Sequence, residues 1–410
     1  MSPQADPTRV DAERAPLTVR SVLWGLLLLL PPLVSGLYIA AVTIPGGSFV
    51  PWEPAMIDLD VYRRTGSMLL QGQDFYVAEG LPWIYPPFAA LLTVPLALIP
   101  LAAAEVAWIT VTILLLMAIL YRLGLSGWVL SLAATAAVWL VEPVRETLGF
   151  GQLGVLLVAA AVLDSMPGRR LLPQRFLPEG ALVGVATAVK LTPATVAATL
   201  FFARRPRPGL VAFFTFVAAT GLGFLLLPRE SMHYWSGLAS GDSGINAGII
   251  FHTNQSIMGA WARLFGELSR GGLVLSALVA VLGIWSAAVV YRSGEQRLAI
   301  CVAGITSLLA SPISWSHHYV WIVPLAVVLL QDRHLARGLR VFGLLYVIWV
   351  VAAPFKQLPG GDGVEATYNV GQQVVVNLGV AAGLVLVLAS GVVAARRVRA
   401  GRAAGDGVLR

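Results

Sequence analysis

The first long apolar stretch, residues 19–42, reads VRSVLWGLLLLLPPLVSGLYIAAV. It is longer than the roughly 7–15 apolar residues of a cleaved signal peptide, so it predicts a retained membrane anchor. The composition agrees, because 57% of the 410 residues are hydrophobic, only 12% are charged and the mean hydropathy is +0.79. Ordinary soluble domains carry about 25% charged residues. The chain is therefore predicted to be an all-α polytopic membrane protein, in which each helix satisfies its own backbone polar groups.

Hydropathy predicts a single membrane domain over residues 1–410 with about twelve transmembrane helices (11–12). Several of the segments are shorter than the roughly 20 residues of a straight span, which favours tilted, broken or re-entrant segments. The apolar segments are 19–42, 87–98, 101–121, 127–141, 151–166, 181–203, 209–227, 271–291, 297–311, 318–331, 338–353 and 373–395.

Arginine placement predicts the orientation, because short cytoplasmic loops of membrane proteins are rich in Arg and Lys. The basic tail 396–410, the loop 332–340 and the turn 204–207 are expected in the cytoplasm, together with the mixed-charge tail 1–17. An even number of spans then places four loops on the outer face. They are the first outer loop 43–86, the second large outer loop 228–270, and the loops 311–317 and 355–372.

One pair of arginines conflicts with this count. Arg169 and Arg170 fall outside if there are twelve spans. Either their loop breaks the rule, or one segment between 87 and 203 is re-entrant. Segment 181–203 is the candidate, because Lys190 and Pro193 interrupt it.

Asp58 is the most informative polar residue, in the stretch IDLDVYRRTG (57–66) of the first outer loop. With Asp60 it forms a D-x-D pattern, which soluble glycosyltransferases use to bind a metal and a nucleotide sugar. No cytosolic α/β domain is present to hold such a site, and residues i and i+2 diverge on a helix. A solvated loop carboxylate is the plain alternative. We favour a general base, with Tyr62, Arg63, Arg64 and Tyr85 in the same loop.

Three further residues are candidates for binding an anion. Lys190 lies inside an apolar run, where an unpaired lysine is costly, so it could hold a lipid phosphate or extend to the interface from a helix end near Pro193. His317 and His318 follow a Ser-Pro break. Adjacent helix positions do not converge on one metal ion, so imidazoles that donate to a phosphate fit better. Capping of a helix at the interface is the alternative.

The remaining outer-loop candidates are less specific. Asn254 and Gln255 are suited either to binding the hydroxyl groups of a sugar or glycerol, or to plain hydrogen bonding within the loop. Trp315 belongs to a set of aromatic residues that are typical both of membrane interfaces and of sugar stacking. The single cysteine, Cys301, excludes a disulfide within the chain.

Six short features, in this order, resemble glycosyltransferase family 87, and the resemblance covers nearly the whole chain. It implies a GT-C fold and the activity of polyprenyl-phosphate-mannose-dependent α-1,2-mannosyltransferases of mycobacteria and their relatives. The likeness is strongest to members that extend phosphatidylinositol mannosides, in which a carboxylate of the first outer loop is the proposed base. The features are Asp58, IYPPF (84–88), GFGQLG (149–154), AVKLTP (188–193), TNQSIMG (253–259) and SPISWSHHYVW (311–321).

The implied reaction agrees with the residue types. A polyprenyl phosphate is a good leaving group that needs nearby cations, and one carboxylate suffices as base for an inverting displacement. The expected catalytic residues are Asp58 as general base, His317 and His318. Lys190, Arg63, Arg64, Tyr62 and Tyr85 are expected to bind the donor phosphate or sugar, and Asn254, Gln255 and Trp315 the acceptor.

We expect no cofactor and no metal. The expected partners are a polyprenyl-phosphate-mannose donor, a glycolipid acceptor and the lipid bilayer, with no nucleic acid. The expected location is the cytoplasmic membrane, with the active site facing the periplasm. The alternatives are another lipid-carrier-dependent sugar transferase (arabinosyl, or lipoglycan-branching mannosyl) and a lipid or sugar transporter. Transporters usually place polar residues near the midplane of repeated halves, so polar outer loops favour an enzyme.

Overall fold

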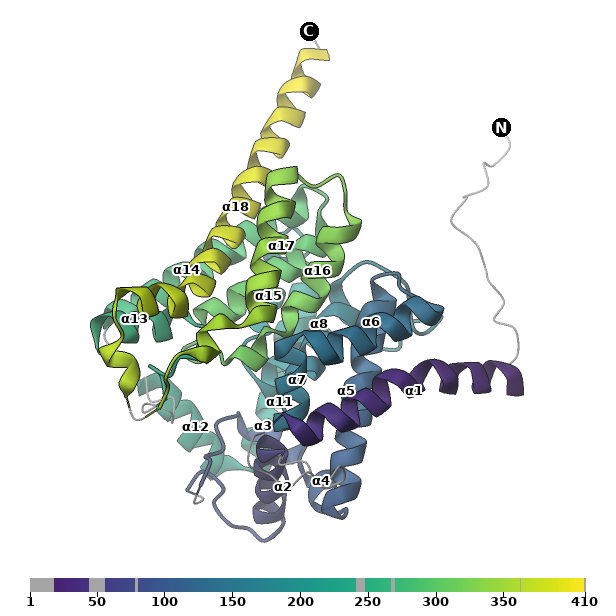
Figure 1. Ribbon diagram of the computed structural model, residues 1–410, viewed down its shortest axis with the longest axis vertical. Coiled ribbons are helices and arrows are strands. Elements are labelled where there is room, and N and C mark those ends of the chain that lie inside the picture. Colours follow the sequence, from purple (N-terminus) through teal and green to yellow (C-terminus); the bar gives the residue numbers. More distant parts are fainter. Residues whose placement is uncertain are drawn as a thin grey trace.

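The computed structural model describes residues 18–43, 56–77, 80–240, 248–266, 270–361 and 363–408, with side chains as far as residue 400. Figure 1 shows an assembly of helices in which α18 extends away from the body at the C-terminal end. The helices are α1 Val19–Val42, α2 Ile57–Leu70, α3 Pro87–Leu91, α4 Val94–Ala97, α5 Leu101–Arg122, α6 Gly127–Leu140, α7 Glu142–Phe150, α8 Gly154–Ser165, α9 Ala181–Val189, α10 Ala194–Phe202, α11 Pro206–Leu226, α12 Pro228–Ser240, α13 Ile257–Phe265, α14 Arg270–Arg292, α15 Gln296–Ala310, η1 Ser316–Trp321, α16 Ile322–Gln331, α17 Arg337–Ala352, η2 Pro354–Gln357, η3 Val364–Thr367 and α18 Val370–Val408.

Within the described residues, six helices are long and apolar enough to cross a bilayer: α1, α5, α11, α14, α17 and α18. Helices α6 and α7 would pass the same test together, but they are bent by 78° where they meet. Four shorter apolar helical stretches accompany them, at Pro87–Ala97, Gly154–Ser165, Gln296–Ala310 and Ser316–Gln331. The predicted helical, multi-pass architecture is confirmed, whereas the number of twelve spans is not.

One end of the molecule, which we call the arginine end, is held together by contacts between loops. Arg122 at the end of α5 donates to the carbonyl oxygens of Met166 and Arg169, at 2.7 and 3.2 Å. Further along the same loop, Glu179 pairs with Arg205 at 2.8 Å. The arginine end also contains the pairs Arg205–Tyr291, Arg297–Leu123, Arg297–Asp332 and Arg397–Glu295.

These contacts explain the conflict over Arg169 and Arg170. The loop that precedes α9 and the turn that follows α10 lie together at the arginine end, so segment 181–203 leaves this end and returns to it. The segment is a re-entrant hairpin, broken where Lys190 adopts an extended conformation and Pro193 caps α10. Counting 181–203 as a span was therefore wrong, and its re-entrant alternative fits the arginine distribution.

Segment 87–98 was also wrongly counted as a span. It forms two short helices, α3 and α4, that lie along α2. Arg63 of α2 donates to the carbonyl oxygens of Leu96 and Ile99, at 3.1 and 2.8 Å. A side chain at Gly66 would meet the carbonyl oxygen of Thr93 at 2.7 Å, so the two segments touch. The segment therefore stays at the end opposite the arginines, which we call the site end.

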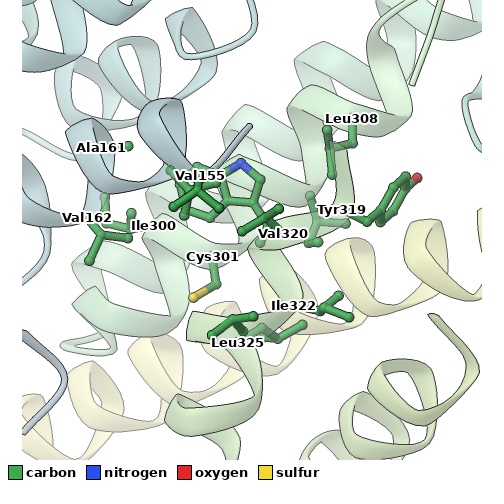
Figure 2. Close-up of a cluster of buried hydrophobic side chains, with 14 of the residues drawn as sticks. Val155, Ala161, Val162, Ile300, Cys301, Leu308, Tyr319, Val320, Ile322 and Leu325 are labelled. Carbon is green, nitrogen blue, oxygen red and sulfur yellow. The ribbon is translucent and has the colours of Figure 1, made fainter. Parts of the chain in front are cut away.

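A cluster of buried apolar side chains packs the helices next to the site (Figure 2). It joins α8, α15, η1 and α16 through buried side chains that include Val155, Cys301, Val320 and Leu325. The ring of Trp321 packs against Gly304 so closely that a Cβ atom there would lie 2.1 Å from it. This packing fixes the short 3₁₀ helix η1, which carries His317 and His318.

Candidate active site

Asp58 lies in the first turn of α2, a helix that falls within the predicted first outer loop. Its side chain is partly buried, whereas Asp60 is exposed on another face of the helix. The two carboxylates therefore diverge, as expected for residues i and i+2. Burial raises the pKa of the Asp58 carboxyl to about 6, and a hydrogen bond from Gln152 and the charge of Lys190 lower it only in part.

The GFGQLG segment brings α7 against the first turn of α2. Gly151 ends α7 in the left-handed conformation, with φ 71°, and a Cβ atom there would lie 2.7 Å from Cβ of Leu59. Only glycine combines this backbone conformation with so close an approach. The next residue, Gln152, is consequently placed beside Asp58.

Gln152 is buried and connects three side chains of the site. Its Oε1 accepts from the hydroxyl groups of Tyr62 at 3.3 Å and of Tyr85 at 3.4 Å, and its side chain is hydrogen-bonded to Asp58. The hydroxyl oxygens of the two tyrosines lie 3.3 Å apart. Sequence reasoning placed both tyrosines near the site but missed Gln152. The available signal was its place in GFGQLG (149–154), one of the six features that resemble family 87.

The tip of the re-entrant hairpin reaches the same place. Lys190 Nζ lies 3.1 Å from Nε2 of His318 and 5.4 Å from the centre of the Tyr85 ring. Its charge acts on Asp58. The structure therefore joins a carboxylate from α2, a lysine from the hairpin and a histidine from η1, which the sequence separates widely.

His318 has a defined tautomer. The backbone N–H of Trp315 donates to its Nδ1 at 3.1 Å, so the proton of the neutral ring is on Nε2. This N–H faces the ammonium group of Lys190, and two donors cannot satisfy each other. Either Lys190 gives up its proton, or the oxygens of an anion accept from both groups. The pair is therefore a candidate anion site beside Asp58.

His317 is next to this pair, with its ring centre 4.6 Å from that of His318. Its ring is buried against Phe150, with ring centres 5.2 Å apart, and its backbone oxygen accepts from the hydroxyl of Thr147 at 3.1 Å. Its Nε2 has no hydrogen-bond partner among the described residues. Of the two histidines, His318 is therefore the one placed at the anion site.

The two arginines predicted to bind the donor lie elsewhere on α2. Arg63 is occupied by the carbonyl oxygens at the end of α4, and Arg64 donates to the carbonyl oxygen of Leu81 at 2.6 Å. Both hold the surrounding chain against α2. Their contact with a donor stays a prediction without support from these contacts.

The three predicted acceptor residues build the loop that precedes η1. Asn254 is fully buried, donates to two carbonyl oxygens and accepts from the N–H of Ser314 at 2.9 Å. The Gln255 amide donates to two carbonyl oxygens at 2.9 and 3.1 Å. Trp315 forms an isolated bridge with Asn254. These contacts give the residues a structural role, and acceptor binding stays a prediction.

In the described part of the chain, no group of three His, Cys, Asp or Glu side chains is arranged to hold a metal ion. Metal independence of the reaction itself remains a prediction.

The candidate site thus places a partly buried carboxylate beside a lysine and a histidine, in a scaffold of apolar helices of which several are long enough to cross a membrane. The chain belongs to glycosyltransferase family 87, whose family model matches residues 83–312. It is thus a glycosyltransferase.

The chain is similar to several characterised mycobacterial enzymes. A polyprenol-phosphate-mannose-dependent α-(1-2)-phosphatidylinositol mannoside mannosyltransferase of Mycobacterium tuberculosis is 32% identical, covering 83% of this chain and 84% of the relative. An enzyme of the same description from Mycolicibacterium smegmatis is 31% identical, covering 81% and 88%. A phosphatidylinositol pentamannoside mannosyltransferase of M. tuberculosis is 37% identical, covering 67% and 65%. No solved structure matches the chain significantly.

Proposed function

We propose that this chain transfers mannose from polyprenyl-phosphate-mannose to a phosphatidylinositol mannoside or a related lipid glycan, with inversion and formation of an α-1,2 linkage. The names of the relatives support this donor and acceptor. The observation that carries the proposal is the placement of Asp58 beside the anion site formed by Lys190 and His318.

The chemistry needs one base and one anion site. Asp58 takes the proton of the acceptor hydroxyl, whose oxygen forms a bond to C1 of the mannose. The bond between C1 and the phosphate oxygen breaks, and its electron pair leaves with the polyprenyl phosphate. Lys190 and the Nε2–H of His318 stabilise the charge that grows on this phosphate. A single displacement converts a β-linked donor into an α-linked product, and no second carboxylate is required.

An apolar groove next to the anion site suits the polyprenyl chain of the donor. It lies between the re-entrant hairpin and α11 and begins at Thr187 and Leu191, which flank Lys190. Along the groove, Phe201 and Phe213 present exposed aromatic surface. A phosphate held at Lys190 would therefore have its lipid tail directed into this groove.

The arginine distribution supports an orientation with the active site in the periplasm. The arginine end joins basic loops from α5 to α18, and such loops remain in the cytoplasm of bacterial membranes. Asp58 lies at the opposite end. The donor and acceptor, both lipids, would then reach the site sideways from the bilayer.

The decisive experiment supplies purified protein with polyprenyl-phosphate-mannose and separate inositol mannosides of defined length, and identifies the products by mass and by linkage analysis. We expect one added mannose in an α-1,2 linkage, with the same rate in excess EDTA. The Asp58→Asn variant should give no product. If only a polyprenyl-phosphate-arabinose donor or a lipoglycan acceptor is used, the chain is the alternative transferase. Substrate movement across proteoliposomes without a covalent product would indicate a transporter and overturn the proposal.

A further inference from the structure

We infer that Gln152 is the positioning residue of the catalytic base: the tyrosine pair of Tyr62 and Tyr85 sets the direction of its amide, and the amide in turn fixes the Asp58 carboxylate. This inference rests on the proposed function, because it assigns Gln152 a role in base catalysis. It gives the GQ pair of the GFGQLG segment a chemical task beyond packing.

The direction of the amide follows from its partners. A carboxamide has one end that only accepts and one that only donates. The hydroxyl groups of Tyr62 and Tyr85 lie 3.3 and 3.4 Å from Oε1, and donation by either one settles which end is the oxygen. The NH₂ group is then left to donate to Asp58. Gln152 is only 4% exposed, so water does not compete for these bonds.

A fixed carboxylate matters because a general base must present one oxygen to the hydroxyl that it deprotonates. Asp58 is in the first turn of α2, and Gln152 is the side chain that is hydrogen-bonded to its carboxyl group. A hydrogen bond from Gln152 to one oxygen leaves the other directed into the site. The same bond favours the ionised form that the reaction requires.

Few other groups act on Asp58. Lys190 is the charged side chain that favours its ionisation, and burial together with the charge of Asp58 raises the pKa of Tyr62 and Tyr85, so both hydroxyl groups stay protonated. Of the helices packed against α2, α3 and α4 carry no titratable side chain. On α7, Arg145 is exposed, and Glu142 and Glu146 are paired with Lys356.

The test compares Gln152→Leu and Gln152→Glu with the wild type over a range of pH. Gln152→Leu removes the donor at similar volume, so we expect kcat to fall by about 10²-fold, the cost of a misplaced catalytic group, with KM for the mannosyl donor unchanged. The acid limb of kcat should move to higher pH. In Gln152→Glu the limb should move further, because two adjacent carboxyl groups share a proton. Gln71→Glu, at the exposed C-terminal end of α2, is the matched control and should match the wild type.

A purely structural Gln152 would give a different result. Thermal unfolding would change, kcat would fall at all pH values alike and the acid limb would stay in place, which overturns the inference. The double variant Tyr62→Phe/Tyr85→Phe provides a second measurement, because it frees the amide to flip and should move the limb in the same direction. If Asp58→Asn remains active, the proposed base itself is wrong. If Asp58→Asn is inactive and the Gln152 variants keep the wild-type limb, only the present inference fails.

Discussion

At the scale of single residues, Asp58 combines two opposing requirements. It must be ionised to accept a proton, yet it is partly buried, and burial raises its pKa to about 6. Below this pH the carboxyl group is protonated and cannot act as a base. We therefore expect kcat to rise with pH through about 6 and then to level off, measured with purified enzyme in detergent or nanodiscs.

The exposed neighbour Asp60 provides the control for this prediction. Asp60→Asn should keep both the rate and the acid limb near pH 6, whereas Asp58→Asn should lose about 10²–10⁴-fold or more. An acid limb near pH 4 in the wild type, or an active Asp58→Asn, would contradict the role of Asp58.

Lys190 and His318 carry a separate prediction about the leaving phosphate. Because its negative charge grows in the transition state, Lys190→Met and His318→Ala should lower kcat more than they raise KM for the acceptor. His317→Ala should affect kcat less, because His317 is turned toward Phe150. Full kinetics with both substrates varied provide the measurement. Wild-type kcat in both Lys190→Met and His318→Ala would mean that the phosphate is held elsewhere.

At the scale of elements, hydropathy predicted helical segments well but not their paths. Segment 87–98 is apolar, yet it lies along α2 because Arg63 binds the carbonyl oxygens at its end. Segment 181–203 is long enough to span, yet it turns back at Lys190. The sequence does contain signals for these paths, namely paired prolines and an isolated lysine, but their effect depends on partners distant in the chain.

The residues of the candidate site could also be predicted only in part from the sequence. Their charge indicated Asp58, Lys190, His317 and His318 in the sequence. The structure brings them together, with the charge of Lys190 acting on Asp58, His318 against Lys190 and His317 against His318. Their charge also indicated Arg63 and Arg64. Both guanidinium groups bind backbone carbonyl oxygens, and their contact with a donor stays a prediction. Gln152 was missed because a neutral amide has no charge and no periodicity to mark it.

The turn at Gly151, which ends α7 and precedes Gln152, leads to a prediction about how α7 and α2 fit together. Gly151→Ala adds both a strained positive φ and a contact with Leu59, whereas Gly72→Ala, with φ 67°, adds the strain alone, because nothing lies within 4 Å of its Cβ position. Strain of this kind costs about 1–3 kcal/mol. Gly72→Ala should therefore lower only the melting temperature. Gly151→Ala should also lose transfer activity, because it displaces Gln152 from Asp58. Equal activity in the two variants would show that the turn at Gly151 does not position Asp58.

At the scale of the whole molecule, the two ends differ in chemistry. The arginine end is a continuous set of ion pairs and hydrogen bonds between loops, whereas the site end gathers the acid–base and anion-binding groups. The re-entrant hairpin connects the two ends of the molecule. Its first and last residues lie at the arginine end, and Lys190 at its tip contacts His318. In the proposed function, this arrangement would let Lys190 reach the lipid phosphate without a full crossing of the bilayer.

Cysteine labelling tests this topology directly. The native Cys301 is buried, so the wild-type chain is an unreactive background. Single exposed cysteines are introduced as Arg169→Cys before the hairpin, Arg207→Cys after it and Asp60→Cys at the site end. With a membrane-impermeant maleimide, we expect intact cells to label only Asp60→Cys, and inverted vesicles to label both arginine positions. If Arg169→Cys and Arg207→Cys react from opposite sides, segment 181–203 crosses the membrane. Lys190 would then belong to a complete span, and its position at the tip of a hairpin would be wrong.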